Sequence, residues 1–339
     1  MVRAFYQARG ATLRWVCDLN PLLLTEIPNR FAGTRTTSSF DRILADPDVR
    51  AVAIAVDAPN HHGLARLALS SGRHVFVEKP LALTTADAED LCALAERADL
   101  TLMVGHLLLY HPAVVRIKAM LRAGELGDVL YLYAQRVNLG IVRRSENAWW
   151  SLAPHDIAVA IDLFEASPAT ISATGDTYLQ RDRDIQDVAF ATLRFGDGRV
   201  AHLHVSWLDP HKRRSLTVVG TRKMLTFDDT LPDEKLKIYD RSAVPRSGHA
   251  TYAEGVVVRV GDVLSPILPS VEPLLAECEH FVACVADRGQ RPRSDGRQGA
   301  AVVRILEAGE RSMRAGGVPI PIGSATESAP PPPQPQTRR

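Results

Sequence analysis

The feature that most constrains the fold is an alternation, between Thr12 and Gly105, of short apolar runs with segments of helical periodicity. The runs read LRWVC from Leu13, AVAIAV from Ala51, HVFV from His74 and TLMV from Thr101. Continuous apolar strands separated by helices are typical of a parallel sheet that is covered on both faces. We therefore expect an α/β domain with a parallel sheet in this part of the chain.

The clearest helix begins after Thr84, where Asp87 is placed to complete a capping box. An apolar stripe follows at the spacing of one helix face, namely Ala88, Leu91, Cys92 and Ala95. This face is expected to pack on the sheet.

Beyond about Leu126 the strand candidates alternate in polarity or pair through turns. They read VLYLYAQRV, ATISATGDTYL, DVAFATLRF, RVAHLHVSW, SLTVVG and KLKIYD, with helices expected over Ala276–Ala286 and Ala300–Met313. This pattern predicts a second, α+β domain with a large, mostly antiparallel open sheet. We place the domains at residues 1–108 and 109–320, and expect a disordered, proline-rich tail over 321–339.

The charge balance excludes some classes of partner. Forty Lys and Arg against 39 Asp and Glu give a net charge of +1, so no bulk positive field attracts nucleic acid or an anionic membrane. No apolar run approaches the roughly 18 residues of a membrane-spanning helix, and the opening residues do not resemble a signal peptide, so the cytoplasm is expected. The cysteines are expected to be buried thiols: Cys17, Cys92, Cys278 and Cys284.

Asp18 ends the first strand, where a dinucleotide-binding unit places an acid that accepts hydrogen bonds from the adenosine ribose. The glycine fingerprint of such a unit lies about 20 residues earlier, which here falls before Met1, and the chain contains no GxGxxG. Residues 1–10 would then end the first crossover helix, and the first strand and phosphate loop would be missing. Since loss of a central strand would leave two edges unpaired, we expect a mis-assigned start.

A series of motifs runs along the chain: Asp18, Ala58-Pro59-Asn60 with His62, Glu78-Lys79-Pro80, Val104-Gly105-His106, Tyr110-His111-Pro112 and the WSLAPHD segment from Trp150 to Asp156. Together they resemble the motifs of the Gfo/Idh/MocA oxidoreductase family, over about Val2 to Gly317. The resemblance implies a Rossmann-like first domain that binds NAD or, less well, NADP. It implies these cofactor contacts: Asp18, Pro59, Asn60, His62, Glu78, Lys79, Pro80 and His106.

The same resemblance implies catalytic roles for Lys79 and His155. Oxidation of a secondary alcohol needs a base for the hydroxyl proton, and histidine titrates near neutral pH. A nearby ammonium stabilises the developing alkoxide. The alternatives are a solvated lysine at a strand end and a helix-packing histidine.

One family position differs, because the aspartate expected four residues before His155 is Ser151. A hydroxyl does not supply the charge of a carboxylate. Either Asp156 takes over, His155 acts alone, or activity is reduced; Asp156 could equally be a residue at the start of the helix.

The segments GHLLLYHPAV, RVNLG and WSLAPHD look most like the branch that acts on nucleotide sugars. Guanidinium and amide groups before the WSLAPHD segment could hold a diphosphate or a uronate carboxylate, or could belong to a solvated loop. Trp149 and Trp150 could line a sugar site or belong to the core. The expected substrate contacts are Lys79, Arg136, Asn138, Asn147, Ser151, His155 and Asp156, with Arg143 and Arg144 nearby.

His202 and His204 alternate along a strand and could share one face, but no third ligand stands at a telling spacing, so no metal is expected.

Taken together, these features predict an NAD-dependent oxidoreductase acting on a sugar or nucleotide sugar, which forms a dimer or tetramer through its open sheet. Asp18 favours NAD because a carboxylate repels the 2′-phosphate of NADP. The alternatives are an inactive sugar-binding or assembly protein of the same fold, and a reductase working mainly from ketosugar to alcohol.

Overall fold

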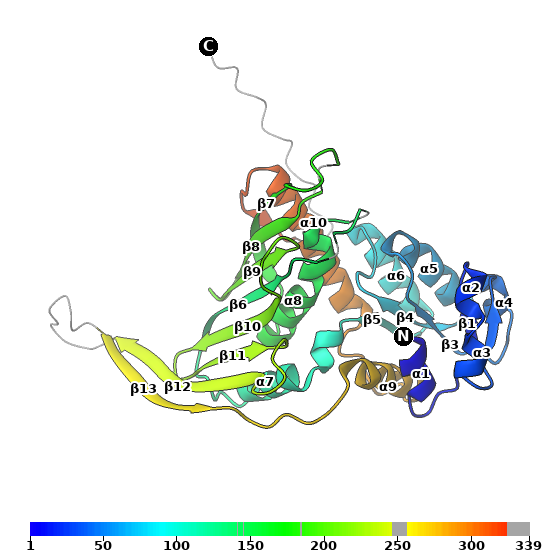
Figure 1. The fold of residues 1–339 in the computed structure, drawn as a ribbon, viewed down its shortest axis with the longest axis horizontal. Coiled ribbons are helices and arrows are strands. Elements are labelled where there is room, and N and C mark those ends of the chain that lie inside the picture. The colour runs from blue at the N-terminus through cyan, green and yellow to red at the C-terminus, as the bar shows by residue number, and fades with distance from the viewer. Residues whose placement is uncertain (141, 145, 184, 246–255, 324–339) are drawn as a thin grey trace, which may run out of the picture.

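The structure is a computed structural model that describes residues 1–140, 142–144, 146–183, 185–245 and 256–323 (Figure 1). The first domain contains β1 (Trp15–Cys17), β2 (Arg35–Thr37), β3 (Ala51–Ile54), β4 (His74–Glu78) and β5 (Leu102–Gly105). Its helices are α1 (Val2–Gln7), α2 (Pro21–Leu24), α3 (Ile27–Arg30), α4 (Phe40–Leu44), α5 (His61–Ser70) and α6 (Thr85–Arg97), with 3-10 turns η1 (Ala58–Asn60) and η2 (Leu107–Tyr110). All strand pairs in this domain are parallel, so the expected Rossmann-like α/β architecture is confirmed.

The five strands form two separate sheets. β1 pairs with β2, and β3, β4 and β5 pair in that order. Among the described residues no ladder joins β1 to β3, whereas a dinucleotide-binding sheet places a further strand between these two positions. α1, expected as the end of a crossover helix, packs between β4 of the first domain and α9: the Phe5 ring lies edge-on to Phe76 at 5.6 Å and to Phe281 at 6.1 Å.

The helix expected after Thr84 is α6. The Thr84 hydroxyl accepts a hydrogen bond of 3.1 Å from the Asp87 backbone N–H, which satisfies one free donor of the first turn. The predicted apolar stripe of Ala88, Leu91, Cys92 and Ala95 is fully buried.

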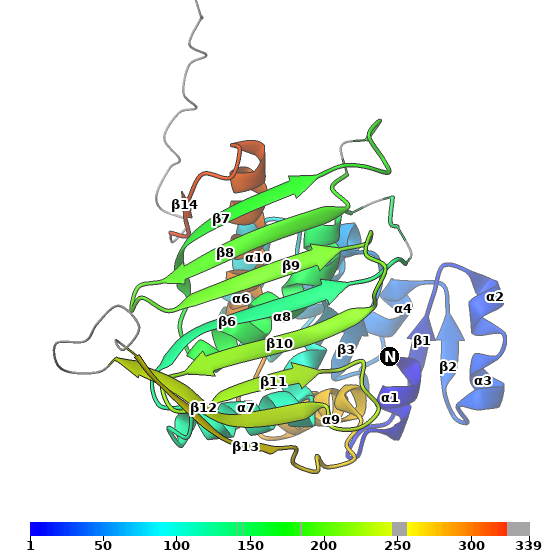
Figure 2. The same ribbon diagram turned by 60° about the vertical axis from the view of Figure 1, so that its left-hand side comes forward.

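The second domain is built on a nine-stranded sheet in the order β13-β12-β11-β10-β6-β9-β8-β7-β14 (Figure 2). The strands are β6 (Val129–Val137), β7 (Pro168–Asp176), β8 (Val188–Phe195), β9 (Val200–Ser206), β10 (Arg213–Gly220), β11 (Met224–Asp228), β12 (Leu236–Pro245), β13 (Val256–Leu264) and β14 (Ile320–Pro321). Every pair is antiparallel except β6 with β9, so the predicted topology is confirmed.

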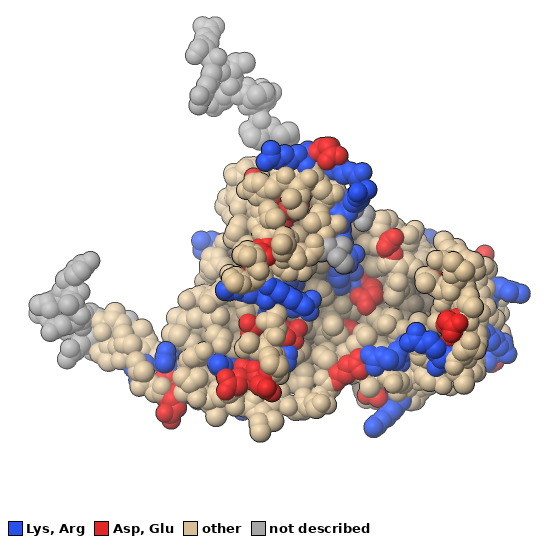
Figure 3. Space-filling model, in the orientation of Figure 1, with Lys and Arg blue, Asp and Glu red and all other residues tan. Residues whose placement is uncertain are grey.

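Helices cover one face of this sheet. α8 (Ala148–Phe164) and α10 (Gly296–Arg314) contact its strands, α7 (Pro112–Arg122) packs on α8, and α9 (Pro273–Ala286) packs on α1 and η2. In Figure 2 the opposite face is turned to the viewer, and no helix crosses it. The surface in Figure 3 carries both signs of charge interspersed, as the net charge of +1 suggests.

α10 runs across both domains and packs against α6 and β5 on one side and α8 and β7 on the other. Two glycines permit this close approach: a Cβ at Gly299 would lie 2.5 Å from Val104, and one at Gly309 would lie 2.7 Å from the Trp149 ring. The Trp149 indole N–H also donates a 2.9 Å hydrogen bond to the Leu306 carbonyl. Trp149 is therefore a core residue that fastens α8 to α10.

At the carboxyl end the chain stays attached to the sheet through Ile322, whose N–H donates to the Ala169 carbonyl at 2.9 Å. Residues 324–339, most of the expected tail, lie outside the described residues. All four cysteines are free, and only Cys17 is partly exposed.

Candidate active site

Lys79 follows β4 at the carboxyl edge of its sheet, where open α/β sheets bind ligands. Its side chain reaches the second domain, where Nζ donates a 3.1 Å hydrogen bond to the Ser151 backbone carbonyl on α8. Burial lowers the pKa of Lys79, an effect that the nearby Glu146 carboxylate opposes. The ammonium is thus held at the domain junction.

His155 lies one turn further along α8 from Ser151, and its Nδ1 atom is buried without a hydrogen-bond partner among the described residues. Burial lowers the pKa of His155 well below its usual value, and the positive charges of Arg136, Lys79 and Arg214 lower it further. The imidazole is therefore neutral near pH 7 and able to accept a proton.

His106, which follows β5, completes this group. It is 1% exposed, and neither ring nitrogen has a described partner. Burial and the charge of Lys79 lower the pKa of His106 to about 3. Lys79, His106 and His155, all named from the sequence, influence one another electrostatically although they come from three separate elements.

Asp156, which follows His155 and could have replaced the family aspartate, pairs instead with Arg136. Asp156 accepts two hydrogen bonds from Arg136, at 3.0 and 2.9 Å, and both side chains are about nine-tenths buried. α8 begins at Ala148, so Asp156 is a mid-helix residue and the helix-start interpretation is wrong. Its two oxygens are used by Arg136, which leaves His155 without a carboxylate partner.

The other residues expected near the substrate differ in their contacts. Asn147 caps α8, with Oδ1 accepting from the Trp150 N–H at 2.9 Å and Nδ2 donating to Gln186 at 2.9 Å. Asn138 Oδ1 is buried without a described partner. Arg143 forms an ion pair of 3.2 Å with Glu146. Arg144 is exposed. The Trp150 indole N–H donates a hydrogen bond of 3.3 Å to the Glu310 carboxylate on α10.

At the cofactor edge, Asp18 directly follows β1, and its Oδ1 accepts from the Asn20 N–H at 2.8 Å. Pro59 and Asn60 form the exposed turn η1 after β3. Burial raises the pKa of Glu78, whose Oε2 accepts from the Lys79 backbone N–H at 3.3 Å. Asp18 after β1 and Lys79 after β4 both follow the carboxyl ends of parallel strands, the edge at which open α/β sheets bind ligands.

The histidine expected at the cofactor turn is directed elsewhere. His62 Nε2 lies 2.9 Å from Asp90 on α6. Its neighbour His61 is the buried imidazole, with Nδ1 2.7 Å from the Pro80 carbonyl and Nε2 2.9 Å from the Val56 carbonyl. His61 therefore ties the turn after β3 to the Glu78-Lys79-Pro80 loop. The adjacent histidines were visible in the sequence, but only the helix orientation distinguishes them.

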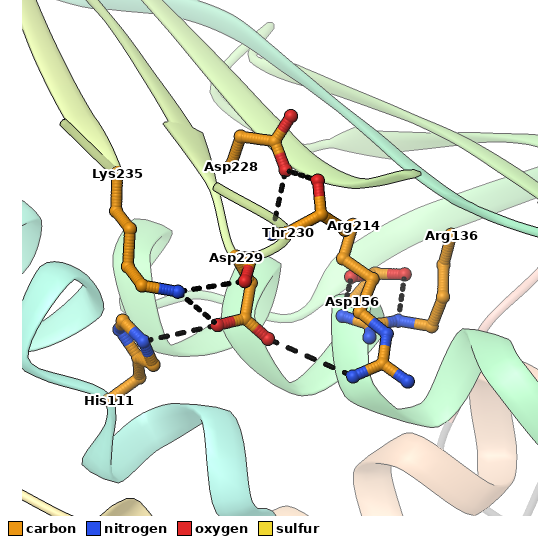
Figure 4. A network of polar contacts seen from close by, with 8 residues as sticks. All are labelled: His111, Arg136, Asp156, Arg214, Asp228, Asp229, Thr230 and Lys235. Atoms are coloured by element: carbon orange, nitrogen blue, oxygen red, sulfur yellow. Dashed lines mark hydrogen bonds and ion pairs between the residues drawn. The ribbon is translucent and has the colours of Figure 1, made fainter. Parts of the chain in front are cut away.

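A polar network links this site to the β11–β12 hairpin (Figure 4). The Asp229 carboxylate lies 3.4 Å from His111, 3.4 Å from Lys235 and 3.9 Å from Arg214. Arg214 and Asp229 were not predicted from the sequence. The only signal was the basic run Lys212-Arg213-Arg214 that opens a strand.

No metal site is formed by His202 and His204. His202 Nδ1 lies 3.0 Å from the Thr192 hydroxyl, and His204 stacks on Phe190 with 4.2 Å between centroids. Among the described residues no group of three His, Cys, Asp or Glu is placed to hold a metal ion, and no described helix is long and apolar enough to cross a membrane.

Several known proteins are similar to this chain. UDP-N-acetylglucosamine 3-dehydrogenase of Acidithiobacillus ferrooxidans is 28% identical over 253 residues, 74% of each chain. Its solved structure has a TM-score of 0.75 at 26% identity, covering 93% of this chain and 95% of that one. D-apiose dehydrogenase of Paraburkholderia graminis is 26% identical over 328 residues, 93% of this chain and 84% of the relative. An oxidoreductase from Agrobacterium radiobacter, solved with NAD⁺, L-tartaric acid and magnesium, shares the fold with a TM-score of 0.77 at 20% identity, over 95% of this chain and 94% of that one.

Two family domains match directly. Residues 1–106 match the oxidoreductase family domain described as an NAD-binding Rossmann fold, and residues 114–226 match the GFO/IDH/MocA carboxyl-terminal domain. The expected cofactor class, NAD, is thereby confirmed. Since the two matches together span more than half of the sequence, the chain belongs to the Gfo/Idh/MocA family of oxidoreductases.

Proposed function

We propose that this protein transfers a hydride between nicotinamide and a secondary alcohol or ketone of a nucleotide sugar, with Lys79 and His155 acting at the reacting oxygen. The observation that carries the proposal is the hydrogen bond from Lys79 Nζ to Ser151 O, which sets the ammonium one helical turn from the neutral imidazole of His155.

In the oxidation direction His155 accepts the hydroxyl proton through a ring nitrogen. Its lowered pKa keeps the nitrogen lone pair free. The ammonium of Lys79 stabilises the negative charge that develops on the oxygen as the C–H hydride leaves. In the reduction direction His155 returns the proton to the oxygen, so reduction of a ketosugar would use the same residues as oxidation of the alcohol.

The bound nicotinamide supplies the hydride acceptor. Asp18 would hold the adenosine ribose, and the carboxylate favours NAD over NADP. The turn after β3 and the Glu78-Lys79-Pro80 loop, joined through His61, would line the cofactor between these ends. No GxGxxG in the sequence supplies the usual pyrophosphate contacts.

The substrate class rests on the similarity to UDP-N-acetylglucosamine 3-dehydrogenase over almost the whole chain. The other relative named above acts on D-apiose, which is also a sugar. A sugar bearing a secondary alcohol is the chemistry they share.

We further propose a homo-oligomer formed through the open face of the sheet. Tyr131, Tyr133 and Phe190 are 39%, 39% and 52% exposed on this face. Tyr133 and Phe190 line a hollow of about 420 Å³ formed by β6, β7, β8 and β9. A second copy covering this face would remove aromatic surface from water.

The test is NADH formation by the purified chain with NAD and UDP-N-acetylglucosamine, beside the Lys79→Met and His155→Asn variants. We expect each variant to lose about 10²- to 10⁴-fold in kcat/KM. Calorimetric titration with NAD, run also on a version extended upstream with a strand and glycine loop, separates cofactor binding from chemistry. Full activity of Lys79→Met would overturn the proposed roles, and sugar binding without turnover in either version would favour an inactive sugar-binding protein.

A further inference from the structure

Arg214 lies at the start of β10, opposite Arg136 in the antiparallel register with β6. Opposed residues in a ladder point to the same face of the sheet. Arg136 reaches the helix layer, where it binds Asp156. Leu216 and Val218, at the same alternation as Arg214, are buried on that side. Figure 4 shows the Arg214 guanidinium between Asp229 and the Arg136–Asp156 pair.

The two arginines differ in how their charge is compensated. Arg136 is held by both oxygens of Asp156 and is almost fully buried. Arg214 has one contact among the described carboxylates, at 3.9 Å from Asp229, and its side chain is 45% exposed. Asp229 is shared with His111 and Lys235, each at 3.4 Å. One carboxylate shared by three cationic or titratable groups leaves Arg214 largely uncompensated.

The position of Arg214 relative to the chemistry follows from these contacts. Its register partner Arg136 is bound to the residue directly after His155. The charge of Arg214 contributes to the low pKa of His155, so the two groups are close enough to interact. Glu146 is the carboxylate that raises the pKa of Lys79 most, and it already forms an ion pair of 3.2 Å with Arg143. The site thus carries excess positive charge on the side of β10.

We propose that Arg214 binds an anionic group of the substrate, carried on the same sugar ring as the carbon that reacts. A guanidinium presents paired donors that match a carboxylate or a phosphate, and an exposed arginine beside a buried, neutralised one is free to do so. Two groups supply this chemistry: a carboxylate of a uronate and the phosphate on the anomeric carbon. This inference rests on the proposed function for the identity of the sugar site, but it concerns binding and not hydride transfer.

The test is equilibrium binding to the full chain in the presence of NAD, measured by calorimetry with three probes: D-glucuronate, glucose 1-phosphate and neutral glucose. The variants are Arg214→Met and Arg214→Lys. The matched control is Arg213→Met, which removes the same charge from the adjacent residue on the opposite face of β10.

We expect the unmodified chain to bind at least one anionic probe more tightly than glucose. Arg214→Met should weaken that probe about 10- to 100-fold, as loss of a charged hydrogen bond does, and should not change glucose binding. Arg214→Lys should recover part of the loss, and Arg213→Met should match the unmodified chain. The probe that is weakened identifies carboxylate or phosphate as the source.

Equal affinity for glucose and both anions, failure of both anions to bind, or an unchanged Arg214→Met variant would each overturn the inference. The proposed function fails separately. Anion binding that depends on Arg214, without NADH formation, would support this subsite and overturn the proposed hydride transfer. Turnover of neutral sugars that does not depend on Arg214 would support the hydride transfer and overturn the subsite.

Discussion

The hydrogen bond from Lys79 Nζ to the Ser151 carbonyl uses the backbone and not the side chain of residue 151. The family aspartate that Ser151 replaces is therefore not needed to hold this lysine in place. The departure from the family pattern removes a charge beside His155 but keeps the lysine anchored to α8.

A first prediction follows from this contact. Ser151→Ala keeps the backbone carbonyl that Lys79 binds and removes only a hydroxyl, so the variant should keep kcat/KM within about threefold of the parent. The measurement is steady-state NADH formation. A loss of more than a hundredfold would mean that the hydroxyl itself takes part in the reaction.

The pH profile of kcat/KM should report the lowered pKa of His155. A base whose pKa lies below its usual value stays unprotonated as the pH falls, so the acid limb should lie below pH 6.5. Arg214→Met, which removes one of the charges that lower this pKa, should move the limb upward. An acid limb above pH 7 in the parent protein would contradict a lowered pKa of His155 in its role as the base.

Stability should also depend on pH through His106. Its folded pKa is about 3, below the unfolded value of 6.5, so between these limits the unfolded chain binds a proton that the folded protein does not. Stability is thus complete above about pH 6.5 and falls as the pH drops, by up to about 1.4 kcal/mol per unit. His106→Leu should lose about 2 kcal/mol less than the parent between pH 6.5 and 5. Urea unfolding at the two pH values measures this, and identical pH slopes would count against it.

The Arg136–Asp156 pair should be costly to break from one side. Asp156→Asn leaves a buried guanidinium without its counter-charge, and we expect a loss of about 3–5 kcal/mol in the free energy of unfolding. The double variant Arg136→Met with Asp156→Leu removes both charges and should recover much of that loss. Chemical denaturation compares the three proteins. A single variant within about 1 kcal/mol of the parent would show that the pair is not desolvated.

The open sheet face gives a prediction about assembly. Phe190 lies on β8, with its side chain on the sheet face opposite the helices. Phe190→Lys should convert the proposed oligomer to monomers, because burying an unpaired charge in the interface costs free energy. Light scattering after size exclusion measures the mass. The control Arg199→Ala, at the end of the adjoining hairpin, should keep the parent mass. A parent protein that is already monomeric would exclude this interface.

The sequence predicted most of the strands and helices because their signals are local. The alternation of β8 and β9 about the Gly196–Gly198 turn and the apolar stripe of α6 are read from neighbouring residues. β2, β11, β13 and β14 were missed. β2, β11 and β14 are short, and β13 takes its place by pairing with β12. Periodicity carries no information about such a partner.

For the site, the sequence named Lys79, His106 and His155 but did not reveal which residues their neighbours contact. The partner of Asp156 lies 20 residues earlier, on a strand of the sheet under α8, and no local pattern pairs the two. The choice between His61 and His62 depends on which side of α5 meets the Pro80 loop. Arg214 becomes adjacent to Arg136 only through the register of β10 with β6.

The course of α10 has a consequence for how this site works. Because Gly299 seats the helix against β5 and Gly309 seats it against Trp149, one continuous rod fixes the spacing between the two halves of the molecule. Lys79 belongs to the first domain and Ser151 to the second, so the packing of α10 on both domains also positions the two ends of their hydrogen bond. A bulkier residue at Gly309 would push α10 away from Trp149 and so change the position of Ser151 relative to Lys79.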